Sequence, residues 1–147
     1  MSANAREAFP WRFEREELLR FGHCDPAGIA YFPRLDELLN GLFEDWCAAM
    51  GLPLRDLIHR DRMGFPLVHA TVEYEAPLVL GDRLRLTQQV HAVGRSSLTV
   101  DLTIMRGDTR CVSARHVRVM ISLDTQRAIP LPAALRARFA TEPGDGA

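Results

Sequence analysis

The chain has 147 residues, a length that fits one domain with one ordinary hydrophobic core. Its 18 basic and 19 acidic residues leave a formal net charge of −1, which gives no electrostatic reason to expect binding to nucleic acid or to an anionic membrane. Three widely spaced cysteines (Cys24, Cys47 and Cys111) form no Cys-x-x-Cys pair, and no run resembles a leader or a membrane span, so we expect a cytoplasmic protein with reduced thiols.

The N-terminal third is expected to hold an arm, a strand and a long helix. Residues 1–10 are polar and small, which predicts a flexible arm, and the partial alternation over residues 11–21 favours a first strand. Gly51 and Pro53 are typical of a helix end, and residues 54–62 predict a short second helix. The helix before them begins near Pro33, and its apolar residues follow the three-and-four spacing of one buried face: Leu35, Leu38, Leu39, Leu42, Phe43, Trp46 and Met50.

After Gly64 the hydrophobic period changes to two, which predicts strands. Apolar and polar residues alternate over 68–75, 84–92 and 98–104, and the stretch 111–123 reads as one more long, largely apolar strand. Glycine-containing turns separate these runs, and short turns predict antiparallel neighbours. Pro132 is expected to open a short terminal helix, and the tail 141–147 is expected to be disordered.

This order of elements predicts an α+β fold in which an antiparallel five-stranded sheet wraps around the long central helix. The domain should cover residues 11–140. A single helix cannot cover five long strands, so another subunit should bury one face or one edge of the sheet. We therefore expect a homo-oligomer, either a dimer or a tetramer.

The segment from Phe21 to Pro33 is the main candidate for chemistry. It places the carboxylate of Asp25 before a glycine-containing, otherwise apolar stretch, and loss of hydration there would raise the basicity of the carboxylate. Free amides at the start of the long helix favour developing negative charge, so one segment could supply a reacting carboxylate and donors for a carbonyl. The Asp-Pro pair is also a common helix opening, in which Asp25 would be only an N-cap.

This segment resembles the active-site motif of the 4-hydroxybenzoyl-CoA thioesterase family of hot-dog-fold proteins. Weaker similarity continues through residues 51–53, 64–68 and 117–119, so the resemblance covers roughly residues 13–121. It implies a hot-dog fold and hydrolysis of an acyl-CoA, with 4-hydroxybenzoyl-CoA or another aromatic or short acyl group as the substrate. The matching positions of the motif are Phe21, Gly22, Cys24, Asp25, Pro26, Ala27, Gly28, Ile29 and Pro33.

The resemblance also implies roles for individual residues. Asp25 would be the catalytic carboxylate, acting either as nucleophile or as base for water, and the backbone amide of Phe32 would polarise the thioester oxygen. His23, Gly28 and Tyr31, the last of which replaces a tryptophan of the motif, would contact the substrate. His23 replaces an aspartate, and if this stretch is extended His23 lies on the same side as Asp25 and could shift its pKa.

Further candidates lie outside the motif. Phe65 could line the acyl pocket with Trp46, although core packing explains both rings equally well. Arg95 falls where the family carries a basic cluster for the CoA nucleotide, yet it could equally be a solvated turn residue. Arg118 matches an arginine of the family motif and is expected to have a structural role in the sheet.

Two other classes of function remain open. One is a hot-dog dehydratase or hydratase, whose characteristic motifs do not occur in this sequence; the other is a non-catalytic module that binds acyl thioesters. We expect no cofactor, and because no pair among the five histidines has ligand spacing, we expect no metal site.

Overall fold

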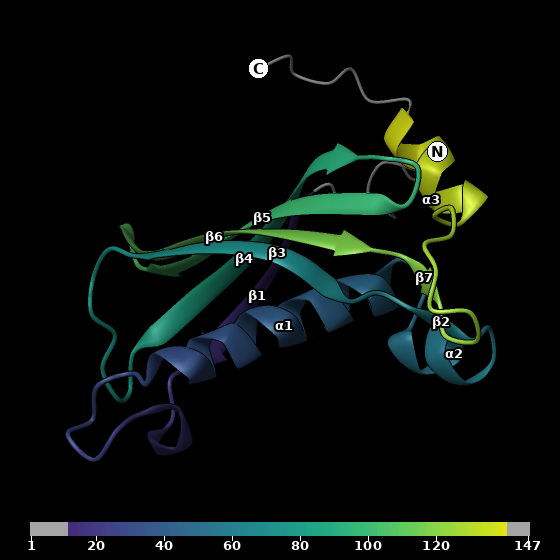
Figure 1. Ribbon diagram of the computed structural model, residues 1–147. Helices are drawn as coiled ribbons and strands as arrows, with labels where there is room; N and C mark the ends of the chain where they lie inside the picture. The colour runs from purple at the N-terminus through teal and green to yellow at the C-terminus, as the bar shows by residue number, and fades with distance from the viewer. Residues whose placement is uncertain (1–11, 141–147) are drawn as a thin grey trace, which may run out of the picture.

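The structure, a computed structural model, describes residues 12–140 (Figure 1). The predicted arm, 1–10, and the predicted tail, 141–147, lie outside these residues. In chain order the elements are β1 (Arg12–Leu18), a 3-10 helix (Phe21–His23), α1 (Phe32–Ala49), α2 (Leu54–His59), β2 (Met63–Gly64), β3 (Leu67–Tyr74), β4 (Arg83–Val93), β5 (Ser97–Arg106), β6 (Thr109–Val119), β7 (Ile121–Ser122) and α3 (Ala133–Ala140).

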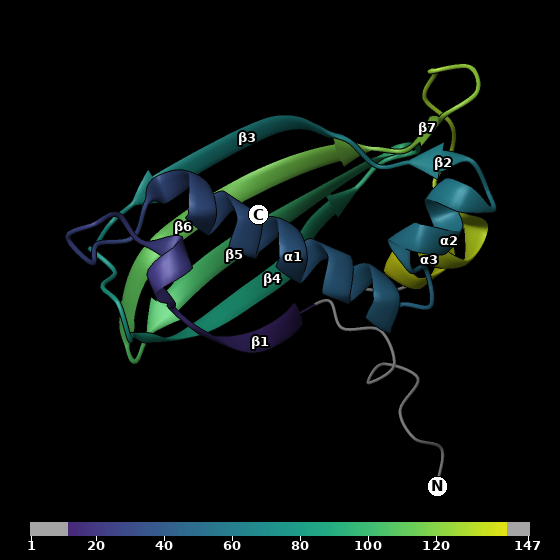
Figure 2. The same ribbon diagram turned by 90° about the horizontal axis from the view of Figure 1, so that it is seen from below.

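Five of these strands form one antiparallel sheet in the order β1-β4-β5-β6-β3. The sheet curves over α1, as Figure 2 shows from the helix side, which confirms the expected α+β class and the sheet wrapped around a long helix. The expectation that β3 neighbours β4 is wrong, because the chain from residue 75 to 82 crosses the end of the sheet. β3 therefore pairs with β6 at the opposite edge, and within residues 12–140 its other side has no strand partner.

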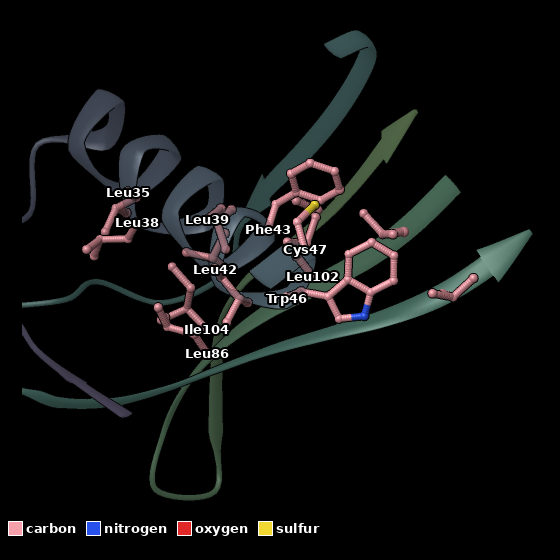
Figure 3. Close-up of a cluster of buried hydrophobic side chains, with 14 of the residues drawn as sticks. Leu35, Leu38, Leu39, Leu42, Phe43, Trp46, Cys47, Leu86, Leu102 and Ile104 are labelled. Atoms are coloured by element: carbon pink, nitrogen blue, oxygen red, sulfur yellow. The ribbon is translucent and has the colours of Figure 1, made fainter. Parts of the chain in front are cut away.

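The apolar stripe of α1 packs against the inner face of the sheet (Figure 3). Leu39, Leu42, Phe43 and Trp46 are at most 1% exposed, and burying each such side chain contributes about 1.5–3 kcal/mol. Gly51 has φ +77° and ends the helix, as its position in the sequence predicts. This packing fixes the position of α1 and therefore of its N-terminus.

The predicted strand over residues 111–123 is divided in two at Met120. The N–H of Met120 donates to Ser96 O at 2.8 Å, and its carbonyl accepts the N–H of Ile129 at 2.9 Å, so neither group continues the β6 ladder. The two residues of β7 pair instead with β2 in a small separate sheet. Among the described residues, no helix is both long and apolar enough to cross a membrane.

Candidate active site

Asp25 lies in a tight loop between the 3-10 helix and α1. Its Oδ1 accepts the backbone N–H of Ala27 at 2.9 Å and of Ile29 at 3.1 Å, and its own N–H donates to Ile29 O at 2.8 Å. Gly28 completes the loop with φ +79°, a left-handed conformation that favours glycine. The N-cap interpretation is wrong, because the residue that precedes α1 is Tyr31. The loop holds one oxygen of the Asp25 carboxylate and leaves Oδ2 without a partner in the described chain.

The loop is attached to the connection between β3 and β4. The N–H of Leu80 donates to Gly28 O at 2.9 Å, and the N–H of Ala30 donates to Leu78 O at 2.9 Å. Two segments more than 45 residues apart in the sequence therefore hold each other by backbone hydrogen bonds. As a result the position of the Asp25 carboxylate depends on the sheet as well as on the local turn.

α1 begins beside this loop with an amide that has no internal acceptor. The N–H of Phe32, the first residue of the helix, donates to no group in residues 12–140, whereas the N–H of Tyr31 donates to His23 O at 2.9 Å. Pro33 has no N–H, so it does not compete for an acceptor at this end. Because a helix N-terminus carries partial positive charge, the Phe32 amide is suited to bind an oxygen that becomes negative.

His23 does not stand in the predicted relation to Asp25. Phe21–His23 forms a 3-10 helix and is not extended, so the premise of that prediction is wrong. The Nδ1 atom of His23 accepts the backbone N–H of Arg20 at 2.9 Å. Its side chain is occupied in closing the 3-10 turn that leads into the Asp25 loop.

A groove extends from this loop along the gap between α1 and the edge strand β3. The part nearest the loop has a volume of about 360 Å³ and an apolar lining of Ile29, Ala30, Phe32, Leu35, Tyr74, Ala76, Pro77 and Leu78. The part farther along the helix has a volume of about 280 Å³ and is lined by Pro33, Asp36, Glu37, Asn40, Leu67, Ala70, Val72, His116 and Arg118. The two parts adjoin, because Phe32 and Pro33 are consecutive and Val72 and Tyr74 lie on one face of β3.

Two polar side chains of β6 are buried at the far part of the groove. Arg118 is 6% exposed; its guanidinium donates to Phe65 O at 3.1 Å and to Asn40 Oδ1 at 2.6 Å, and it lies 4.0 Å from the ring centre of Phe43. His116 is 4% exposed, and burial together with the charge of Arg118 lowers its pKa to about 4. The imidazole is therefore neutral near neutral pH. Arg118 ties α1 to the sheet, as expected, but it also lines the groove.

The remaining predicted site residues are spread over the molecule. Tyr31 and Phe32 are 51% and 58% exposed, with ring centres 5.7 Å apart beside the Asp25 loop. Phe65 is half-buried; its ring lies 5.4 Å from that of Phe43, and its carbonyl accepts from Arg118, but it does not line the groove. Trp46, which is 1% exposed, belongs to the core.

Arg95 lies at the turn between β4 and β5, next to α3, at the opposite end of the sheet from the Asp25 loop (Figure 1). The 11 residues of β4 extend roughly 35 Å between those two ends. Arg95 and Asp25 of one chain therefore do not belong to one compact site. A phosphate contact by Arg95 stays a prediction.

Asp36, Asn40 and His116 line the groove although no motif in the sequence marks them. One signal was available for His116, because it occupies an inward-facing position, as does Arg118, on a strand whose other inward residues are apolar. A polar residue at such a position is uncommon and points to a binding or tethering role. Asp36 and Asn40 lie on the groove side of α1 because β3 takes the edge position beside that helix, and the sequence alone does not predict this position of β3.

Comparison with known proteins gives consistent results. A sequence profile of the Thioesterase-like superfamily matches residues 19–139. A 1,4-dihydroxy-2-naphthoyl-CoA hydrolase from Synechococcus elongatus is 30% identical over 125 residues, which is 84% of this chain and 92% of the relative. A crystal structure of a 1,4-dihydroxy-2-naphthoyl-CoA thioesterase from Synechocystis has a TM-score of 0.80 at 24% identity and covers 90% of this chain and 99% of its own.

A third similar protein is a gentisyl-coenzyme A thioesterase of known structure, with a TM-score of 0.77 at 22% identity. It covers 84% of this chain and 99% of its own. None of these three proteins is named a 4-hydroxybenzoyl-CoA thioesterase. The expected family is therefore confirmed at the level of the superfamily and not at the level of that enzyme.

Proposed function

Because this chain belongs to the Thioesterase-like superfamily, a family of hot-dog-fold hydrolases of acyl-CoA thioesters, we propose that its substrate is the CoA thioester of a hydroxylated aromatic acid. The observation that carries this proposal is the Asp25 loop and the free Phe32 amide, both at the head of an apolar groove with aromatic side chains at its rim. The relative from Synechococcus elongatus, named for a dihydroxynaphthoyl thioester, supports the choice of a hydroxylated aromatic acyl group.

In the proposed mechanism the free Oδ2 of Asp25 performs the first chemical step. As a base, it takes a proton from water while the water oxygen attacks the thioester carbon. The tetrahedral intermediate then breaks its C–S bond, and the departing CoA thiolate takes the proton back from Asp25. As a nucleophile, it attacks that carbon itself, releases the CoA thiolate and leaves a mixed anhydride that water then hydrolyses. Both routes place negative charge on the carbonyl oxygen, which the Phe32 amide and the N-terminus of α1 stabilise. The products are the free acid and CoA.

The test is release of free CoA thiol from a panel of thioesters. We expect kcat/KM for a hydroxylated aryl thioester, such as 6-hydroxy-2-naphthoyl-CoA or 4-hydroxybenzoyl-CoA, to exceed that for acetyl-CoA and palmitoyl-CoA by roughly tenfold or more. A preference for an aliphatic acyl group would contradict the proposed substrate class. Formation of an enoyl thioester from 3-hydroxyacyl-CoA without thiol release would instead identify a dehydratase, and binding without turnover would identify a non-catalytic module.

We further propose that the protein acts as a homo-oligomer assembled through β3. In the part of the chain that the structure describes, this strand pairs only with β6, so its outer edge presents backbone donors and acceptors that a second chain can bind. Leu67, Val68 and Tyr74 on the same strand are 43%, 57% and 49% exposed. We expect light scattering to give at least twice the mass of one 16.5 kDa chain, and Val68→Asp to shift the protein towards monomer. A monomeric wild-type protein would contradict this.

A further inference from the structure

The far part of the groove contains a buried positive charge without a matching negative one. Arg118 makes its hydrogen bonds to a backbone carbonyl and to the amide oxygen of Asn40, and among the described residues no carboxylate forms an ion pair with it. Within the described residues, Nε of Arg118 has no hydrogen-bond partner, and neither has Nδ1 of His116. Buried charges are normally paired, and an unpaired buried donor costs about 1–3 kcal/mol. This part of the structure has donors that protein acceptors do not use.

We propose that Asn40, His116 and Arg118 form a subsite for a hydroxyl group at the far end of an aromatic acyl group, a proposal that rests on the thioesterase function above. Arg118 holds the Asn40 side chain by its Oδ1, which leaves both N–H groups of that amide without an acceptor in the described chain. The neutral imidazole of His116 has one N–H to donate and one nitrogen to accept. Together these groups bind an oxygen at the end of the groove.

The charges around the subsite favour a hydroxyl over a carboxylate. Asp36 and Glu37 line the same part of the groove, and among residues 12–140 only Glu37 has a cationic partner, Arg34. Loss of hydration raises the pKa of Asp36, as expected for a carboxylate at the wall of a groove. A second carboxylate on the substrate would be repelled here, whereas a phenolic hydroxyl can donate to Asp36 and accept from the subsite. An acyl group with a purely apolar far end would displace water from Arg118 without offering it a hydrogen-bond acceptor.

The length of this part of the groove favours two fused rings over one. Pro33 and Asn40 bound it along α1, and seven residues of helix extend roughly 10 Å. A thioester carbonyl at the Phe32 amide must therefore be followed by an acyl group long enough to approach Asn40. The walls contributed by Leu67, Ala70 and Val72 are apolar and suit the faces of such rings.

The matched substrates are 6-hydroxy-2-naphthoyl-CoA and 2-naphthoyl-CoA, which differ only in a hydroxyl on the ring farthest from the carbonyl. We expect the wild-type protein to hydrolyse the hydroxylated thioester with a kcat/KM roughly tenfold or more higher, as one hydrogen bond to a charged group provides. In His116→Leu and in Asn40→Asp this ratio should fall to near one. Asn40→Asp keeps an acceptor for Arg118, so the fold is retained.

The control is Arg115→Gln, one residue from His116 but on the opposite face of β6, which should leave the ratio unchanged. Equal hydrolysis of both thioesters by the wild-type protein, or an unchanged ratio in both variants, would overturn the subsite.

Binding of the free acids, measured by calorimetry, decides the same question without turnover. There 6-hydroxy-2-naphthoate should bind more tightly than 2-naphthoate and than 2,6-naphthalenedicarboxylate; tighter binding of the dicarboxylate would show a carboxylate subsite. Absence of thiol release with normal acid binding would reject the proposed function and retain the subsite.

Discussion

Replacing Asp25 with asparagine is expected to lower kcat for the best acyl-CoA substrate by roughly 10²–10⁴-fold, the contribution of a positioned base or nucleophile. The amide oxygen of asparagine can accept the same two N–H groups, from Ala27 and Ile29, that Asp25 Oδ1 accepts. The loop should therefore keep its conformation, and the midpoint of thermal unfolding should stay within about 4 °C of the wild-type value. What the variant lacks is the free anionic oxygen that takes a proton or attacks carbon. Thiol release and circular dichroism measure the two quantities.

Two further variants test whether the loss of activity is specific to the Asp25 carboxylate. Asp124→Asn removes an equally negative side chain that is 66% exposed and, among the described residues, pairs only with Arg62, so activity should not change. Asp36→Asn removes the carboxylate on the groove side of α1 and should alter the choice of acyl group more than kcat. Full activity in Asp25→Asn together with loss of activity in Asp36→Asn would move the catalytic carboxylate from the loop to the helix.

Patterns with a strict period allowed the elements of the fold to be predicted. The apolar stripe from Leu35 to Met50 predicts a helix, and the structure has α1 over Phe32–Ala49. Alternation predicts β3, β4 and β5 within two residues at each end. Strand order was harder, because the residues after Tyr74 carry the same turn signals as a hairpin but cross the end of the sheet to β4. Local turn chemistry does not show which edge a strand will join.

The candidate site, like the fold, could be predicted only where it depends on local sequence. The motif locates the Asp25 loop, since its glycine and its Asp-Pro pair act within a few residues. The predicted relation of His23 to Asp25 assumes an extended chain, but residues 21–23 form a 3-10 turn in which the His23 ring accepts the Arg20 N–H, and no pattern in the sequence indicates this turn. The groove could not be predicted from one stretch of sequence. It brings together the loop, one face of α1, the edge strand β3 and two residues of β6, which only the folded chain places side by side.

Removing one backbone N–H at the start of α1 tests the second half of the proposed mechanism. Phe32→Pro deletes that donor, and it should lower kcat by roughly 10²–10³-fold with little effect on KM, as loss of one oxyanion donor does. The substitution suits the fold, because proline is favoured at the first position of a helix and the Phe32 N–H has no acceptor in the described residues. In addition, Tyr31 has φ −81° and ψ 114°, which a following proline allows.

Phe32→Leu is the matched control, since it also removes the aromatic ring but keeps the amide, and its kcat should stay within several-fold of the wild-type value. Equal activity in the two variants would mean that a group other than this amide stabilises the thioester oxygen. A large loss in the proline variant alone would show that α1 contributes its first N–H to the reaction.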